Sequence, residues 1–313
     1  MKPSPKAVSV IGKLLMVASF AFIVMQVLRY DVDFSVLASP VVITGLLLTI
    51  LIFGFGIVFA GLNYKWLIGN VTGVSLENRL VIKVYCTSNM YKYIPGTVMY
   101  LIGRNRIALE TQKVSHAQIA LATATEGMFI LLSAVIIIAV SVHDEAVFYM
   151  RHVDVPAFVW IIIAAVLFTV ALLAVIFRRR LGTILKKFAD AMKNFSLATK
   201  AKRLGTAMLI LMVLAVSYLV TLMLLGQQVT LAMMPTIIGL YLLSWLVGFL
   251  TPGAAGGMGI REAVLLMFMG GYLSPAIVVS SAIMHRVVCI GGDVLAYGIT
   301  FAYSKTGCAC KSQ

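Results

Sequence analysis

A few charged side chains interrupt segments of this sequence that are otherwise apolar, and they are the residues best able to do chemistry. Within long apolar runs, or close to Pro-Gly pairs, stand Arg104, Glu110, Glu126, Arg261, Glu262, His285, Arg286 and Asp293. Arginine binds phosphate or carboxylate oxygens through a planar fork of N–H donors. Carboxylates inside a membrane pair with cations or carry protons. These residues therefore favour an anion site, proton transfer or internal ion pairs.

Two interpretations of these charges are open. In the first, they form buried ion pairs that fix the register of the helices, with Glu126 or Glu262 reaching Arg286 from a neighbouring helix. In the second, the arginines bind an anionic lipid head group, and the carboxylates balance them or bind an amine. Arg286 and Asp293 lie seven residues apart, so they share one helix face and are expected to line one wall of a cavity. His285 is expected to be packed or hydrogen-bonded rather than to carry protons.

The composition places these residues in a membrane protein. The chain has 313 residues, of which 61% are hydrophobic and 12% charged, and its mean hydropathy is +1.03. Soluble domains carry about 25% charged residues. Residues 204–260 contain no Asp, Glu, Lys, Arg or His, although one crossing needs only about 20 residues. The net charge of +14 is expected to lie in cytoplasmic loops next to anionic lipids, so no nucleic-acid partner is predicted.

The hydropathy pattern predicts an all-α membrane protein with about six full spans. They are expected at 10–29, 40–63, 115–142, 156–177, 205–226 and 275–302. Two further apolar regions, 76–110 and 230–270, are each broken by a Pro-Gly pair, because proline removes a helix hydrogen bond and glycine weakens a helix. Each is predicted to be a re-entrant hairpin of two half-helices.

The two broken regions look like copies of one another. Pro95-Gly96 is followed by Arg104, and Pro252-Gly253 is followed by Arg261, nine residues after the proline in each case. Duplication predicts one membrane domain, 1–313, with halves 1–157 and 158–313. Broken helices that meet near the membrane midplane often bind substrate in transporters. The predicted substrate-binding residues are Arg104, Arg261, Arg286, Glu126, Glu262, Asp293, Pro95, Gly96, Pro252 and Gly253.

The distribution of charge predicts the topology. With a cytoplasmic N-terminus, the nine basic residues of segment 178–203 lie inside, and so does the C-terminal tail. The outer loops then keep Arg29 and Arg151, so the positive-inside rule is obeyed. Three spans separate the two hairpins, and the second hairpin should therefore enter from the opposite face, as in an inverted repeat. We expect a multi-pass protein of the plasma (inner) membrane.

The two broken segments also resemble a known family. "YIPGTVMYLIGRNRIAL" precedes a span with Glu126, and "TPGAAGGMGIREAVLL" precedes a span with "MHRVVCIGGD". Together they resemble the transmembrane flippase domain of lysylphosphatidylglycerol synthases, over nearly the whole chain. The most specific part is a P-G-x-x-G-x-x-E core, stretched here to "PGAAGGMGIRE". The resemblance implies movement of a lipid between leaflets, and without a soluble aminoacyl-transferring domain it does not imply synthase activity.

The sequence leaves three functions in competition. The first is a translocase for a phosphate-bearing lipid, such as a polyprenyl-phosphate-linked sugar or a modified phospholipid, with an anionic lipid as its partner and possible proton or ion coupling. The second is a polyprenyl-dependent glycosyltransferase or a lipid phosphatase. The third is an ion or small-solute transporter. No ATP-binding loop or hydrolase motif occurs, so we expect no enzyme activity, no cofactor and no metal. The tail with Cys308 and Cys310, the oligomeric state and the lipid are left open.

Overall fold

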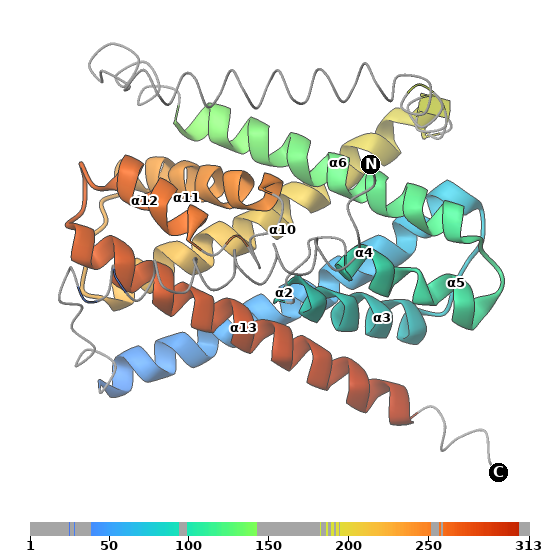
Figure 1. Cartoon of the computed structure of the whole chain (residues 1–313), viewed down its shortest axis with the longest axis horizontal. Coiled ribbons are helices and arrows are strands. Elements are labelled where there is room, and N and C mark those ends of the chain that lie inside the picture. Colours follow the sequence, from blue (N-terminus) through green and yellow to red (C-terminus); the bar gives the residue numbers. More distant parts are fainter. Residues whose placement is uncertain are drawn as a thin grey trace, which may run out of the picture.

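The protein is an all-α membrane protein. The computed structural model describes residues 39–93, 99–142, 195–251 and 259–306, together with Gly257 and isolated positions near 25–28 and 182–193. Throughout these residues the secondary structure is helical, without β-strands (Figure 1). The predicted spans 10–29 and 156–177 fall almost wholly outside the described residues, and so do Cys308 and Cys310.

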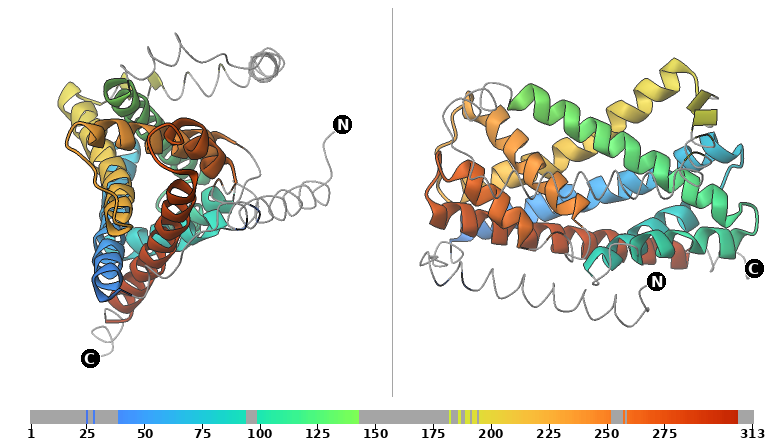
Figure 2. Two further views of the ribbon diagram at one scale, coloured as in Figure 1. Left: turned by 90° about the vertical axis from the view of Figure 1, so that its left-hand side faces the viewer. Right: turned by 45° about the horizontal axis from the view of Figure 1, so that its top comes forward.

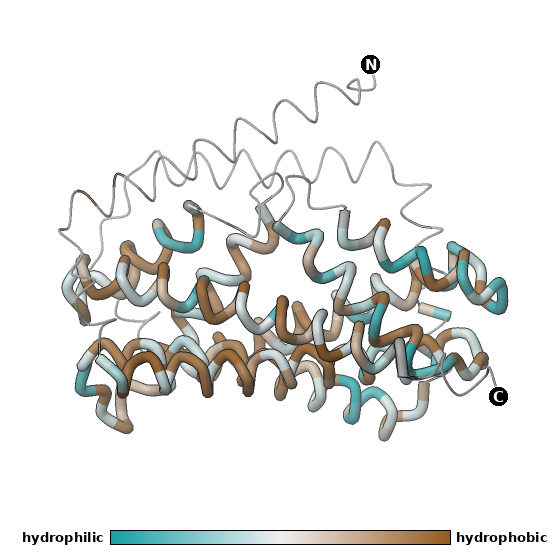
Figure 3. The backbone as a smooth tube through the Cα atoms, turned by 90° about the horizontal axis from the view of Figure 1, so that it is seen from below, coloured by the Kyte–Doolittle hydropathy of each residue, from teal (hydrophilic) through white to brown (hydrophobic). Residues whose placement is uncertain are grey.

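Five of the described helices are long and apolar enough to cross a membrane. They are α2 (Pro40–Thr72), α6 (His116–Ser141), α10 (Leu197–Leu224), α11 (Met233–Leu250) and α13 (Pro275–Thr306). Four of them lie on the predicted spans 40–63, 115–142, 205–226 and 275–302. The middle of the helices is mostly apolar, and hydrophilic residues gather towards the ends (Figure 3).

Several helices extend beyond their predicted bounds. α2 continues to Thr72 and α10 begins at Leu197, because polar residues at the ends continue the helical hydrogen bonding outside the apolar tract. Helix starts follow ordinary capping rules. Pro40 occupies the first turn of α2. Ser115 and Gln118 form a capping box on α6, and the Ser196 side chain accepts the Thr199 N–H of α10 at 3.1 Å.

Both broken regions contain a helix, an interruption and a second helix. The first region comprises α3 (Asn78–Met90), the short 3-10 turn η2 (Tyr91–Tyr93), α4 (Met99–Arg104) and α5 (Arg106–Thr111). The second comprises α11 and α12 (Ile260–Met269). α11 was predicted as a half-helix, yet its 18 residues reach about 27 Å at 1.5 Å per residue. The Pro95-Gly96 and Pro252-Gly253 pairs lie outside the described residues.

The two broken regions enter the helix bundle from opposite ends (Figure 1). We call the end where α2 finishes the basic end. There the Arg79 guanidinium of α3 lies 4.6 Å from the ring centroid of Tyr303, near the end of α13. α11 begins at the other end, where Gly239 packs against Ser141, the last residue of α6, and against Val142 that follows it. Seen end on, the described helices form a roughly triangular outline (Figure 2). The duplication of the two halves stays a prediction, and so does the assignment of each end of the bundle to a face of the membrane.

Glycine allows a close helix crossing between α2 and α13. A Cβ on Gly54 would lie 3.1 Å from the Gly292 carbonyl oxygen, and a Cβ on Gly292 would lie 3.2 Å from the Gly54 nitrogen. Small residues let backbones approach in membranes, where dispersion contacts drive packing. This crossing fixes α13, which carries His285, Arg286 and Asp293, against the rest of the bundle.

Replacing Gly292 by alanine should therefore destabilise the protein by about 1–3 kcal/mol, the usual cost of overpacking. The added Cβ would lie 2.5 Å from Phe53 Cδ1 as well as close to the Gly54 backbone. Gly298→Ala on the same helix is the matched control, because a Cβ there meets no atom within 4 Å. Thermal unfolding in detergent compares the two variants. Equal midpoints would contradict a tight crossing.

Candidate functional site

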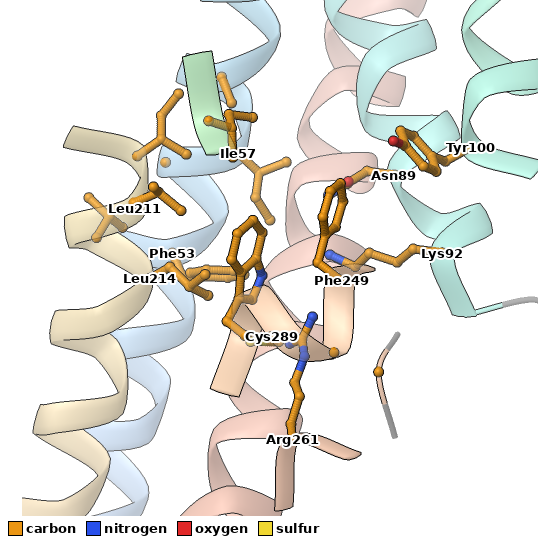
Figure 4. A pocket seen from close by; sticks show the side chains of 18 of the residues that line it. Phe53, Ile57, Asn89, Lys92, Tyr100, Leu211, Leu214, Phe249, Arg261 and Cys289 are labelled. Atoms are coloured by element: carbon orange, nitrogen blue, oxygen red, sulfur yellow. The ribbon is translucent and has the colours of Figure 1, made fainter. Parts of the chain in front are cut away.

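The largest group of buried charges surrounds a cavity between the two broken regions. The cavity has a volume of about 310 Å³, at the lower end of the usual size of small-molecule sites. The apolar side chains of its lining come mainly from α2, α10 and α11, with Phe53, Ile57, Leu211, Leu214, Trp245 and Phe249. The charged side chains come from η2, α4, α6, α12 and α13. Phe53, Ile57, Leu211 and Leu214 lie on one side of the cavity, and Asn89, Lys92 and Tyr100 lie on the other (Figure 4). A ligand in this cavity would therefore contact charge on one side and hydrocarbon on the other.

Arg261 reaches the cavity because glycines leave room for its side chain. A Cβ on Gly248 would lie 2.6 Å from Arg261 Cγ, and a Cβ on Gly257 would lie 2.7 Å from Arg261 Nε. Gly257 and Gly259 have φ values of 74° and 80°, a conformation that side chains with a Cβ rarely adopt. The turn before α12 thus needs glycine both for its backbone and for the arginine beside it.

The Arg261 guanidinium has no carboxylate partner among the described residues. Its Nε is buried and makes no hydrogen bond. Figure 4 shows the side chain reaching into the cavity, while Lys92 points inward from the opposite broken region. A buried donor without an acceptor costs free energy, so this group is suited to an anion that arrives from outside the chain.

Glu262 ties the glycine turn to α13. Its Oε2 accepts the Gly259 backbone N–H at 2.8 Å, which caps the start of α12. Its Oε1 accepts Arg286 Nε at 2.5 Å. The Glu262 side chain is 4% exposed and that of Arg286 is 22% exposed. The predicted ion pair between Glu262 and Arg286 is thus present, and it holds the Arg286 side chain at the cavity wall.

The first broken region carries a similar pair, Arg104 with Glu126. The Tyr85 hydroxyl donates to Glu126 Oε1 at 3.0 Å. The Arg104 guanidinium carbon also lies 4.6 Å and 4.4 Å from the ring centroids of Tyr64 and Tyr85, close enough for cation–π attraction. Arg104 is therefore held from three sides, and the ion-pair interpretation describes it well.

Asp293 lies behind the cavity wall instead of on it. Its Oδ1 accepts the Asn89 amide at 2.7 Å. Its Oδ2 accepts the Tyr93 hydroxyl at 2.5 Å and pairs with Lys92 Nζ at 2.7 Å. Asn89, Lys92 and Tyr93 all line the cavity, while Asp293 itself is 1% exposed. The prediction that Arg286 and Asp293 line one wall is therefore corrected, because the polar residues of α3 and η2 cover the aspartate.

The charges around the cavity do not cancel. Four cationic side chains line it, from Lys92, Arg104, Arg261 and Arg286. Two lining carboxylates, Glu126 and Glu262, and the adjacent Asp293 leave one positive charge in excess among the described residues. Arg104 Nε and Arg286 Nη2 are buried without a hydrogen-bond partner, as is Arg261 Nε. Several unused donors and an excess positive charge suit an anion with several oxygens, such as phosphate.

His285 also lines the cavity, but both of its ring nitrogens are occupied. Nε2 lies 2.7 Å from the Ser217 hydroxyl and Nδ1 lies 3.2 Å from the Tyr241 hydroxyl. The Tyr241 ring packs edge to face on the imidazole, with centroids 5.0 Å apart. This matches the expected packed and hydrogen-bonded histidine.

Several site residues escaped the sequence analysis. Asn89, Lys92 and Tyr93 bind Asp293, and Tyr85 binds Glu126. A signal was present, since "NMYKYIPG" at 89–96 places amide, hydroxyl and ammonium groups directly before a helix break. The described residues contain no group of three or more His, Cys, Asp or Glu that could hold a metal.

Comparison with protein-family models and with curated proteins gave no match for this chain. The geometry of the cavity is therefore the main evidence for what the protein does.

Replacing Glu126 by glutamine should lower the free energy of unfolding by about 3–5 kcal/mol, because it leaves the buried Arg104 without its counter-charge. The double variant Arg104→Met/Glu126→Gln should recover part of this loss. Glu110→Gln is the matched control, since the Arg106–Glu110 pair is exposed and should contribute at most about 1 kcal/mol. Chemical unfolding in detergent measures all three. Similar losses for Glu126→Gln and Glu110→Gln would contradict the buried pair.

Proposed function

We propose that the protein is a lipid translocase that moves a phosphate-bearing lipid between the leaflets of the plasma (inner) membrane. The observation that carries the proposal is the set of unused arginine donors at one cavity, on Arg104, Arg261 and Arg286. A phosphate or diphosphate group offers several acceptor oxygens and negative charge, so it would satisfy these donors together.

The opposite wall favours a lipid over a fully polar solute. Phe53, Ile57, Leu214 and Phe249 face the cavity without polar groups in their side chains. An acyl or polyprenyl chain can pack on these residues while its head group reaches the arginines. A soluble organic phosphate would leave this apolar surface in contact with water, which costs about 25 cal/mol per Å².

The arrangement of the broken regions supports movement across the membrane. They reach the cavity from opposite ends of the bundle (Figure 1), as the half-helices of many secondary transporters do. Interrupted backbone is tolerated at membrane depth where protein buries it or water reaches it. The resemblance to the flippase domain of lysylphosphatidylglycerol synthases points to the same activity.

The basic end supports a cytoplasmic position for the end of α13, and so for the C-terminal side of the chain. Lys65, Arg79, Lys83 and Lys202 lie at that end of the helices, and α13 finishes there. Positive charge collects on the cytoplasmic side of membrane proteins.

The energy source is proposed to be the lipid gradient itself or a coupled proton. Glu126, Glu262 and Asp293 are each bound to at least one cation. Protonation of one of them would free its partner and change the charge of the cavity, which is what coupling to a proton gradient requires.

Arg261→Gln should slow lipid movement strongly without unfolding the protein. Because Arg261 has no carboxylate partner among the described residues, its removal leaves no buried anion unpaired. Loss of its charged contacts should slow exchange at least about 30-fold, the effect of about 2 kcal/mol. The measurement uses liposomes with fluorescent lipids and dithionite, which bleaches only the outer leaflet. Phosphatidylglycerol and a polyprenyl phosphate are compared with an uncharged glycosyl diacylglycerol, whose sugar head group also hinders spontaneous exchange.

Arg106→Gln, outside the cavity, is the matched control and should keep wild-type exchange. The unfolding midpoint of Arg106→Gln should equal that of the wild type, and that of Arg261→Gln should be equal or higher, because the variant removes an unpaired charge. Wild-type rates in Arg261→Gln would remove the anion site from the proposal. Exchange of the neutral lipid at the same rate as the phosphate lipids would exclude recognition of the head group. Uptake of a soluble organic phosphate without exchange of any lipid would favour the small-solute transporter.

A further inference from the structure

A second cavity lies at the basic end, between the end of α2 and the start of α10. Its volume is about 360 Å³, and it shares no lining residue with the cavity described above. Lys65, Trp66, Asn70, Ser75, Lys202 and Arg203 are among the residues that line it. In contrast to the first cavity, most of these side chains are polar or charged.

Arg203 is the buried group at this site. It is 5% exposed, and its Nη1 donates to Asn63 Oδ1 at 2.5 Å and to the Asn63 carbonyl oxygen at 3.3 Å. Its Nε is buried and has no hydrogen-bond partner. None of the ion pairs in the described part of the chain involves Lys65, Lys202 or Arg203. Three cations therefore meet at one cavity without a counter-charge from the described residues.

Trp66 holds two of these cations in place. Its ring centroid lies 5.7 Å from Lys202 Nζ and 5.9 Å from the Arg203 guanidinium carbon, distances typical of cation–π pairs. The ring is also 42% exposed. Tryptophan is enriched at the level of lipid head groups, so this position fits the membrane surface.

The start of α10 adds to the positive potential. The first turn of α10, from Leu197, has no acidic residue, and Lys202 and Arg203 follow in the second turn. The macrodipole places partial positive charge at a helix N-terminus and disfavours cations there. A bound anion next to Lys202 and Arg203 would relieve both the dipole and the mutual repulsion of the side chains.

We propose that this second cavity binds the phosphate of an anionic phospholipid head group, separately from transport through the first cavity. The cavity would bind a phosphodiester or phosphomonoester anion. Lys65, Lys202 and the free Nε of Arg203, beside Trp66, would contact its oxygens. A lipid in this position would fix the packing of α2 against α10 at the membrane surface.

The test follows thermal unfolding in neutral detergent during titration with dihexanoyl phosphatidylglycerol, dihexanoyl phosphatidylcholine or inorganic phosphate. It is done in the Arg261→Gln background, which weakens the anion site of the first cavity. Lys65→Gln/Lys202→Gln removes two cations of the second cavity while leaving the buried Arg203–Asn63 contacts intact. Lys83→Gln/Lys200→Gln is the matched control, because it removes the same charge from the same end and neither lysine lines either cavity.

Phosphatidylglycerol should raise the unfolding midpoint more than phosphatidylcholine does. Its apparent affinity should fall about 30-fold in Lys65→Gln/Lys202→Gln, about fivefold for each cation near a lipid surface, and should change little in the control. An equal response to inorganic phosphate would assign the site to free phosphate, and a response confined to the lipid would assign it to a head group. Equal weakening in both double variants, or no shift with any phosphate compound, would overturn the proposal.

Discussion

A guanidinium inside a membrane protein needs hydrogen-bond acceptors and a counter-charge, and this requirement organises the centre of the molecule. Arg104 has its counter-charge in Glu126, and Arg286 has its counter-charge in Glu262, although each keeps one buried donor without an acceptor. Arg261 has no such carboxylate among the described residues. A chain selected for stability alone would replace that arginine by an apolar residue, because unpaired buried charge is destabilising. Its presence beside an apolar wall is the main reason to infer a bound anion.

The broken helices are the means by which these charges reach the middle of the bundle. Gly248 and Gly257 make room for the Arg261 side chain, and Glu262 both caps α12 and fixes Arg286. Gly257, Gly259, Arg261 and Glu262 therefore act together to place two arginines at the cavity. The cations at the basic end are positioned differently, because they lie near the N-terminus of an unbroken helix, α10. One site lies inside the bundle and the other at its surface. In both, an arginine has a donor without an acceptor and no carboxylate partner among the described residues.

The sequence predicted much of this arrangement because charge is conspicuous in an apolar chain. Four of the described long helices lie on predicted spans, and every charged residue of the predicted site lies in or directly behind the cavity wall. Partners were harder to predict. Arg104 and Glu126 meet because α4 packs on α6, and no periodicity within either helix encodes that contact. The role of Lys92, which covers Asp293, was not predicted. A lysine beside tyrosines is typical of a residue at the membrane interface, and only the structure of η2 shows that it reaches Asp293.

The most direct test of a phosphate site is the structure of the protein with its lipid. Cryo-electron microscopy of the protein in nanodiscs that contain phosphatidylglycerol or a polyprenyl diphosphate would locate the head group. The account predicts density for a phosphate within hydrogen-bonding distance, about 3 Å, of Arg261 and of at least one of Arg104 and Arg286, with the lipid chain on the wall of Phe53 and Leu214. A cavity without phosphate density, with Arg261 paired to a carboxylate of the chain itself, would contradict it.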